Sequence, residues 1–486
     1  MLTNFKKLCK KCDSLLNDNI QNITLNAISC LHVLRAHPEI LKQYSFFSSK
    51  RKKNNQSNFF LISILRKILD LLFFIIKNEK LLLYSKHPKK IDCLIISHLV
   101  NTDHLIKKKD FYFGSLQSRL SIYKLSSLIA LRNFTGKNLS TLSKLPFDKK
   151  YYKVILSSFF KINSEIKIIL LFMREFFRIK ILIKKDDKNF YFLKTIGKIK
   201  YLISVFSNIR ISEQVLFLIK LHQPKYLFFT YEGHAWERIV IRKVKEFFPK
   251  IKIIAYQFSI VTKYHHSMFR PLNKIYNPDI IMTSGSITAD LFRRKKLDKT
   301  SKILIYGSDK FTSKAQSKLP EKSILILPEG FCNETKILFD FCILASTHLP
   351  EFKFYFRLHP LIKKNDFIKK NCTKEFPGNL IISNNILEKD FKESKYAIYR
   401  GSATIIEAVN FGLIPIYYSQ KNEISLNPLF KFEKKPFKIQ NVMDLNNTLK
   451  INFEVKKLRK IREYCKSFFQ QPNSAAIKSL VKKLKI

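Results

Sequence analysis

The chain has 486 residues, 46% hydrophobic and 13% aromatic, which excludes disorder of the whole chain and allows two folded domains with an appendage. Its 89 lysines and arginines against 37 aspartates and glutamates give a formal net charge of +52. Such a charge favours nucleic acid, anionic lipid or a nucleotide-linked substrate. Because the basic residues are mostly lysines spread along the whole chain, compositional drift explains the charge equally well, and we expect no nucleic-acid partner.

Residues 1–88 are predicted to be a helical accessory region, broken by a polar, charged run at residues 50–58. No cluster of carboxylates or histidines in this region suggests chemistry of its own. Residues 1–12 lack the uninterrupted apolar core of a signal peptide. We therefore expect a cytoplasmic protein, with the inner face of the cytoplasmic membrane as a further place of residence, since the positive charge attracts anionic lipid.

Cysteines in the accessory region leave two alternatives open. Cys9 and Cys12 form a lone C-x-x-C motif, and Cys30 and His32 follow nearby. Free buried thiols in a reducing cytosol are the expected state. A local zinc site is the alternative, because a structural zinc ion needs four such ligands.

Two apolar segments imitate membrane spans, at residues 59–76 and 165–185. Each carries basic and acidic residues through its middle, and each such charge costs roughly 2.5–3.5 kcal/mol at a bilayer centre. Both segments are therefore predicted to be amphipathic helices that pack on their own domain. The alternative is a helix lying in the plane of a membrane, apolar side down.

From about residue 90, short apolar runs alternate with helical stretches, which is typical of βαβ units and parallel sheets. The predicted strands before the linker are residues 91–98, 226–230, 251–256, 279–282 and 303–306. A polar stretch at residues 307–321 is the predicted interdomain linker. The predicted strands after it are residues 323–327, 352–358, 380–382, 396–399 and 414–418, with helices at 333–347 and 403–411.

The fold class predicted from this alternation is α/β, with two Rossmann-like domains facing a cleft and a helical N-terminal extension. The predicted boundaries are 1–88 for the accessory region, 89–307 for the acceptor domain, 308–453 for the nucleotide-binding domain and 454–486 for a basic helical region. Ligands of such folds bind at the carboxyl ends of the strands.

The motif richest in chemistry follows the predicted strand 396–399 and reads Arg400-Gly401-Ser402-Ala403-Thr404. Gly401 permits a tight turn, and Ser402 is a suitable N-cap for a helix from about Ala403. The free amides and positive dipole end of that helix form an anion site, to which Arg400 and Thr404 add donors.

Glu407 lies one turn further on, on a helix otherwise made of Ala, Ile, Val, Asn and Phe. Its carboxylate suits the two hydroxyls of a ribose, and Gly412 occupies the predicted C-cap. The motif resembles the nucleotide-binding segment of GT-B glycosyltransferases, and its Thr404-x-x-Glu407-x-x-x-x-Gly412 spacing is similar to that of the lipid-linked N-acetylglucosaminyltransferases of peptidoglycan synthesis. The resemblance implies that Glu407 contacts the ribose and that the small-residue turn contacts phosphate.

A second motif, Arg357-Leu358-His359-Pro360, ends the predicted strand 352–358. His359 at a strand end can donate to a phosphate or protonate a leaving group, and Arg357 can neutralise charge. A His-Pro pair with a Ser/Thr turn about 40 residues later resembles bacterial polysialyltransferases and poly-glycerolphosphate transferases. The resemblance implies that His359, Pro360 and the later turn contact a nucleotide phosphate.

The predicted acceptor side is the stretch from Tyr231 to Arg238, which contains the chain's single Trp. Glu232 or His234 can serve as the base that an inverting transfer needs. The polysialyltransferase-like families carry an acidic-acidic-Gly motif there, and this chain matches only Glu232-Gly233, because Tyr231 replaces the first acid. An inactive relative of these enzymes is therefore one alternative.

Gly330, at the end of the predicted strand 323–327, is a further predicted nucleotide contact. No Asp-x-Asp motif follows a suitable strand, so we expect metal-independent catalysis and no cofactor. The sequence thus predicts a glycosyltransferase of surface polysaccharide synthesis that uses a CMP-, UDP- or GDP-linked sugar and a glycan or lipid-linked acceptor. A polyol-phosphate transferase or nucleotide-sugar epimerase of the same fold and a basic nucleic-acid-binding protein are the alternatives.

Overall fold

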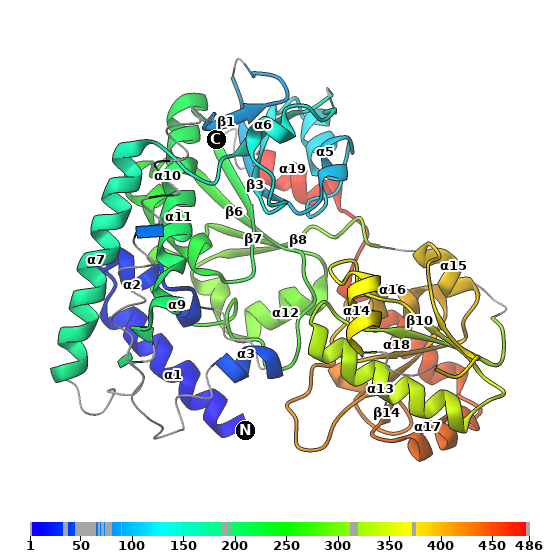
Figure 1. The fold of residues 1–486 in the computed structure, drawn as a ribbon. Helices are drawn as coiled ribbons and strands as arrows, with labels where there is room; N and C mark the ends of the chain where they lie inside the picture. Colours follow the sequence, from blue (N-terminus) through cyan, green and yellow to red (C-terminus); the bar gives the residue numbers. More distant parts are fainter. Residues whose placement is uncertain are drawn as a thin grey trace.

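The structure, a computed structural model, contains two parallel-sheet α/β bodies joined by a linker and by the C-terminal helices (Figure 1). It describes residues 2–32, 37–43, 80–88, 90–148, 150–185, 193–194, 196–311, 319–371 and 376–482, together with residues 65, 66, 69 and 72. The predicted α/β class, with two Rossmann-like domains in a GT-B-like arrangement and a helical N-terminal extension, is confirmed.

The N-terminal domain is built on an eight-stranded sheet with the order β1-β4-β3-β2-β5-β6-β7-β8. All neighbours are parallel except the edge pair β1 and β4. The strands are β1 (Leu82–Tyr84), β2 (Cys93–Leu99), β3 (Ser127–Asn133), β4 (Tyr152–Leu156), β5 (Tyr226–Thr230), β6 (Lys252–Gln257), β7 (Ile280–Thr283) and β8 (Lys302–Ile305). Five of them were predicted; β1, β3 and β4 were not, and β1 lies in the region predicted to be helical.

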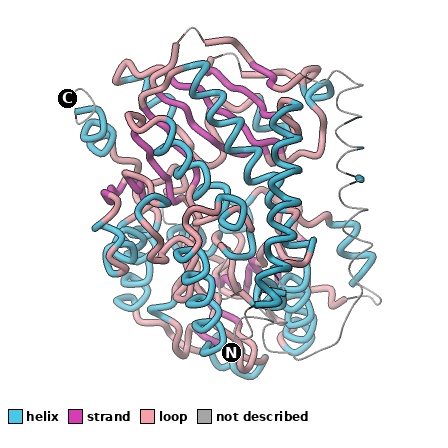
Figure 2. The backbone as a smooth tube through the Cα atoms, turned by 90° about the vertical axis from the view of Figure 1, so that its left-hand side faces the viewer, coloured by secondary structure: helices cyan, strands magenta, loops and turns pink. Residues whose placement is uncertain are grey.

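Helices cover both faces of this sheet (Figures 1 and 2). Successive side chains of β2 point to opposite faces of the sheet, so Leu94 and Ile95 belong to different cores. The helices and helical turns of this domain are η3 (Thr102–Leu105), α5 (Leu116–Ile122), α6 (Leu139–Leu142), α7 (Ile162–Lys185), α9 (Ile199–Leu202), α10 (Ser204–His222), α11 (Ala235–Phe247), η4 (Lys274–Tyr276), α12 (Ser286–Arg294) and η5 (Leu297–Lys299).

The N-terminal extension packs against α7 and α10 of this domain. Its elements are α1 (Leu2–Asp18), α2 (Ile23–Asn26), η1 (Ser29–Leu31) and α3 (Pro38–Gln43). Their apolar side chains share a core with α7 and α10. Cys9 and Cys12 are buried free thiols, as expected, and Cys30 is buried too. The described residues contain no cluster suited to a metal ion.

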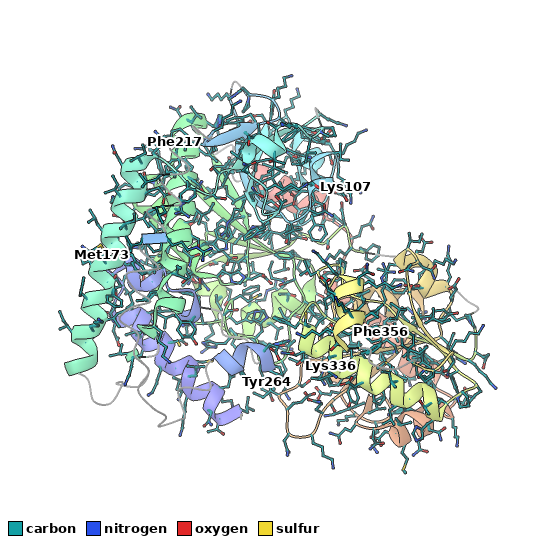
Figure 3. All side chains as sticks on the ribbon, viewed as in Figure 1. Lys107, Met173, Phe217, Tyr264, Lys336 and Phe356 are labelled. Carbon is teal, nitrogen blue, oxygen red and sulfur yellow. The ribbon has the colours of Figure 1, made fainter. Side chains whose placement is uncertain are left out.

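The C-terminal domain is a six-stranded sheet, all parallel, with the order β11-β10-β9-β12-β13-β14. Its strands are β9 (Ser323–Leu327), β10 (Lys353–Phe356), β11 (Leu380–Ile382), β12 (Tyr396–Tyr399), β13 (Ile414–Tyr418) and β14 (Lys438–Ile439). The central strands are buried on both faces, and Phe356, labelled in Figure 3, is fully buried. The helices are α13 (Cys332–His348), α14 (Lys364–Asn371), α15 (Leu387–Lys392), α16 (Thr404–Phe411), η6 (Phe430–Phe432) and α17 (Val442–Leu449).

The C-terminal helices return to the N-terminal domain, which the sequence did not predict. α18 (Val455–Phe468) packs against both α16 and α12, and α19 (Ser474–Lys482) packs against α5. Gly285 and Gly307 lie so close to this segment that a Cβ on either would be 2.2 Å and 2.5 Å from its carbonyl oxygens. The predicted boundary at residue 454 remains a prediction, but the segment after it joins the two sheets.

The segments that imitate membrane spans have different outcomes. α7 is amphipathic as predicted: Ile168, Phe172 and Phe176 are buried in the core, while charged residues occur along its length. Most of the segment 59–76 lies outside the described residues. Within the described part of the chain, no helix is sufficiently long and apolar to span a bilayer.

Candidate functional site

The centre of the C-terminal sheet is a topological switch point. The order 3-2-1-4-5-6, counted along that domain's own strands, reverses between β9 and β12. Loops that follow these two strands leave in opposite directions and open a crevice outside the carboxyl edge, where nucleotides bind in doubly wound folds. The predicted motifs at Gly330, at His359 and at Gly401 follow β9, β10 and β12, which are neighbours in the sheet.

The three predicted motifs of this domain are packed against one another. A Cβ on Gly330 would lie 3.1 Å from the ring of His359, and one on Gly401 would lie 2.8 Å from Oε2 of Glu329. The Glu329–Gly330 loop therefore lies between His359 and the 401–404 turn. The structure thus brings together the residues that the sequence assigned to phosphate recognition.

His359 is held as a donor. The backbone N–H of Leu361 donates to its Nδ1 over 3.2 Å, so in the neutral ring the proton is on Nε2. Burial lowers the pKa of His359 below its ordinary value, against a smaller opposite effect of Glu329. The ring is half-buried and Pro360 beside it is exposed. A neutral imidazole with its proton on Nε2 can donate a hydrogen bond to a phosphate oxygen without adding a positive charge.

α16 begins one residue later than predicted. Its N-cap is Ala403, and no side chain caps it, so the prediction that Ser402 caps the helix is wrong. Ser402 is buried, whereas Gly401, Ala403 and Thr404 are half-buried. The uncapped amides of the first turn are what an anion site requires. Gly412 is the C-cap as predicted, with φ of 127°.

Arg400 does not offer its side chain to a ligand in this structure. The guanidinium is fully buried and bonds to Glu334 over 2.7 Å and to Glu423 over 2.7 Å, with a further bond to the Tyr418 carbonyl. Two carboxylates next to it satisfy a buried guanidinium, so its nitrogens are occupied. The predicted phosphate contact of Arg400 is corrected accordingly: the side chain anchors the turn that the helix follows.

Arg357 and Glu407 border the same edge of the sheet. Nη1 of Arg357 donates to Asp390 over 2.7 Å and to the Asn385 carbonyl over 2.7 Å, which fixes the strand end to the loop after β11. Glu407 is half-buried, and burial raises the pKa of its carboxyl, with Lys310 of the linker acting in the opposite direction. No described residue donates a hydrogen bond to Glu407 in the structure, so its oxygens are available.

The N-terminal sheet has a matching switch point between β2 and β5. Nε2 of His98 on β2 is 2.9 Å from Oγ1 of Thr230, the last residue of β5. Glu232 and His234 follow β5, and Nε2 of His234 is 3.1 Å from Oε2 of Glu232. Both predicted acceptor-side residues are partly exposed, at 20% and 31% of their side chains. They therefore lie at the ligand-binding edge of this domain.

The turn that holds Glu232 is rigid. The buried carboxylate of Glu237 accepts the backbone N–H groups of Glu232, Gly233 and His234. Burial raises the pKa of Glu237 to about 7. Gly233 has φ of +79°, and a Cβ there would meet the Ser267 carbonyl at 2.3 Å, so only glycine fits. Glu237 positions the turn rather than reacting in it.

Residues that the sequence did not predict gather beside Glu232. His98 makes an edge contact with Tyr112 at 5.2 Å between ring centroids, and Arg132 stacks on Trp236 at 4.6 Å. Burial, together with the charges of Glu232 and Asp110, raises the pKa of Tyr112 to about 12. The sequence signal that could have found His98 is a polar residue at the end of an apolar predicted strand. The same signal was not available for Arg132, because its strand, β3, was not predicted.

Two connections link the switch points. A cavity of about 260 Å³ is lined by Tyr112 and Phe258 of the N-terminal domain and by Lys310 of the linker, which acts on Glu407. On the other side, Nε2 of His37 is 3.1 Å from Oε1 of Glu329. The N-terminal extension therefore contacts the loop after β9, and the linker cavity lies beside the N-terminal domain.

Comparisons with known proteins give fold similarity only. No protein-family model and no curated protein matches the sequence. Similar solved structures include the glycosyltransferase of kitacinnamycin (9% identity, TM-score 0.47, covering 82% of this chain and 100% of that chain). Others are a putative UDP-N-acetylglucosamine 2-epimerase from Listeria monocytogenes (10%, 0.47, 82% and 98%) and spinosyn rhamnosyltransferase complexed with thymidine diphosphate (12%, 0.45, 81% and 100%). With all three TM-scores below 0.5, the residues at the switch points carry the functional proposal.

Proposed function

We propose that the protein is a metal-independent glycosyltransferase that transfers a sugar from a nucleotide-linked donor to a glycan or lipid-linked acceptor in the synthesis of a surface polysaccharide. The observation that carries this proposal is that the loops after β9, β10 and β12 lie against one another at the C-terminal switch point. Gly330 contacts His359, and Gly401 contacts Glu329, beside the uncapped start of α16.

The roles of the site residues follow from their atoms. The amides at Ala403 and Thr404 and the Nε2–H of His359 bind the donor phosphates, and Glu407 accepts the ribose hydroxyls. These donors stabilise the negative charge that develops on the departing nucleotide, which is the task of a cation in metal-dependent enzymes. His359, with its lowered pKa, is a hydrogen-bond donor here rather than an acid.

The acceptor hydroxyl loses its proton to Glu232 or to His234, which are hydrogen-bonded to one another. Either group is partly exposed and follows a switch-point strand, so an acceptor reaches it. His234 orients Glu232 when Glu232 is the base, and Glu232 stabilises the imidazolium when His234 is the base. The donor anomeric carbon then lies between this pair and the phosphate loops.

A nucleotide panel tests the donor site. CMP, CDP, UDP and GDP are added separately to the full chain, and thermal unfolding is followed. We expect one nucleotide to raise the melting temperature by roughly 2–4 °C at saturation. The Glu407→Ala variant should lower that nucleotide's affinity about tenfold, because a hydrogen bond to a charged group is lost.

Glu388→Ala is the matched control, since Glu388 is 64% exposed and lies on α15. The control should bind the nucleotide as the unmodified chain does. A chain indifferent to all four nucleotides but shifted by oligonucleotides would overturn the proposal and favour nucleic-acid binding. Product analysis with the responding nucleotide's sugar separates transfer from epimerisation or polyol-phosphate transfer.

A peripheral position at an anionic membrane completes the proposal. Apolar side chains are exposed along one side of α7, at Ile162, Ile166, Leu170, Phe177 and Ile181. Exposed basic residues, Lys167 and Arg174, lie on the neighbouring side of the same helix. An amphipathic helix of this kind binds in the headgroup region of anionic membranes. Such a position would bring the acceptor-side domain to a lipid-linked acceptor.

A further inference from the structure

Two polar side chains near the proposed base, His98 and Arg132, indicate a second ligand-binding site in the N-terminal domain. His98 on β2 and Arg132 on β3 are register partners in the parallel sheet, so their side chains project from the same face at the carboxyl edge. Both strands belong to the N-terminal switch-point region. The sequence assigned no role to either residue.

His98 and Arg132 pack on the same two aromatic rings. The His98 ring centroid is 5.5 Å from that of Phe134 and 5.7 Å from that of Trp236. The Arg132 guanidinium carbon is 5.1 Å from the Phe134 centroid and 4.6 Å from the Trp236 centroid. Stacking on aromatic rings holds a guanidinium in one orientation while its N–H edge stays available.

The Arg132 guanidinium has neither a hydrogen-bond partner nor an ion-pair partner among the residues that the structure describes. Glu237 is the carboxylate that acts on it, but three backbone amides already occupy that group. Burial lowers the pKa of Arg132 to about 10, so the group is charged at neutral pH. Arg132 is half-buried, so a ligand can reach a charge that water solvates only in part and that no described carboxylate neutralises.

His98 has an unsatisfied atom of its own. Its Nδ1 is inaccessible to solvent and, in the described part of the chain, accepts or donates no hydrogen bond. Nε2 lies 2.9 Å from the hydroxyl oxygen of Thr230, and burial lowers the pKa of the ring to about 3. The ring is therefore neutral at neutral pH and adds no second positive charge beside Arg132.

We propose that the guanidinium of Arg132 binds an anionic group, a carboxylate or a phosphate, on the acceptor sugar. This inference rests on the proposed function, because it places an acceptor at Glu232. His98 is close to both: it packs on the Trp236 ring that Arg132 also stacks on, and it lies 2.9 Å from Thr230, two residues before Glu232. A planar guanidinium binds either oxyanion through two parallel hydrogen bonds. Holding the anion there fixes which hydroxyl reaches the base.

The rings add a recognition surface for the sugar itself. Phe134 is 56% exposed, and Tyr112 lines the cavity that continues toward the linker. Aromatic side chains present an apolar body with a polar edge, which suits the faces and hydroxyls of a pyranose. The acceptor would therefore extend from the anion site across Phe134, with its reacting hydroxyl directed to Glu232.

Three probes test the ligand class on the full chain: glucose 1-phosphate, methyl glucuronide and neutral methyl glucoside. Affinities are measured by ligand-observed NMR titration without a nucleotide. We expect an anionic probe to bind about tenfold more tightly than the neutral one, as a charge-assisted pair is worth that much. The stronger anionic probe distinguishes a phosphorylated acceptor from an acidic sugar.

Arg132→Met should remove the preference for anions, while Arg132→Lys should keep part of it, because the charge remains and the fork is lost. Arg293→Met is the matched control, since Arg293 is 46% exposed and pairs with Asp290 on α12. Phe134→Leu changes an exposed ring, so it tests the stacking even where Arg132→Met fails to fold. Unfolding curves of every variant accompany the titrations.

Equal binding of anionic and neutral probes by the unmodified chain would overturn the inference without any variant. The same holds if Arg132→Met folds and retains the preference. Failure here is distinct from failure of the proposed function, which the nucleotide panel decides. A chain that binds one nucleotide through Glu407 but shows no anion preference keeps the donor site and loses the anion site.

Discussion

At the scale of single residues, the two arginines that the sequence placed near phosphate have other partners. Arg400 is fully buried between Glu334 and Glu423, and Arg357 binds Asp390. Sequence position alone identifies a strand end, where both a ligand and a neighbouring loop are within reach. Arg132, by contrast, lies near the N-terminal switch point and has no ion-pair partner among the described residues. The sequence did not single it out.

Arg400→Met should therefore act on stability first. It leaves Glu334 and Glu423 buried without their cation, which costs about 3–5 kcal/mol of the free energy of unfolding. Denaturant unfolding measures this cost. Arg459→Met, a change at a residue that is 72% exposed, should stay within about 0.5 kcal/mol. A stable Arg400→Met variant that has lost only nucleotide binding would restore the phosphate role predicted from sequence.

At the scale of elements, the contacts of His37 and α3 are unexpected. The region was predicted to be accessory, yet His37 bonds to Glu329, its ring lies 4.6 Å from that of Phe331, and Glu39 accepts from Asn333. These contacts fall on the Glu329–Gly330 loop and on the start of α13 that follows it. The accessory region thus supports the predicted donor site, because it holds the carboxylate of Glu329 in place.

His37→Ala is expected to weaken nucleotide binding about fivefold. Without the hydrogen bond to His37, the Glu329 carboxylate can turn toward the 401–404 turn and repel the ligand. Titration with the nucleotide identified in the panel measures the change. His348→Ala, at an exposed position of α13, should have no effect. Tighter binding in His37→Ala would instead mean that the extension obstructs the site.

At the scale of the whole molecule, the two sheets are tied at more than one place. The linker, the N-terminal extension and the returning C-terminal helices all cross between them. α18 packs on α16, the helix that follows the Gly401 turn, and on α12 of the other domain. A motion of one domain relative to the other would therefore act on α16, whose first turn we propose as the phosphate site.

The charge and the exposed stripe of α7 together predict membrane binding. The full chain should sediment with vesicles that contain anionic lipid and not with neutral vesicles, and about 0.5 M salt should release it, because screening weakens surface attraction. The Leu170→Glu variant should bind several-fold less, whereas Leu344→Glu, at an exposed position of α13, should bind normally. Equal sedimentation of both variants would show that α7 does not form the membrane-binding surface.

Local sequence is sufficient to predict the elements with strong signals. β5, β9, β11, β12 and β13 are short apolar runs between polar residues, and they were predicted with the bounds they have. The turn at Gly401 and the C-cap at Gly412 were likewise local. β1, β3, β4 and β14 were not predicted. β1 and β14 are short edge strands, and β3 and β4 carry polar residues that shorten their apolar runs.

Which side chains can bind a ligand depends on contacts that form only when the chain folds. Arg400 and Arg132 both follow or end a strand, and nothing local distinguishes them. Burial against Glu334 and Glu423 satisfies Arg400, whereas the rings of Phe134 and Trp236 support Arg132 without neutralising it. Partners distant in the sequence set the electrostatic state of each group, so the chain specifies the loops locally and their chemistry only after it has folded.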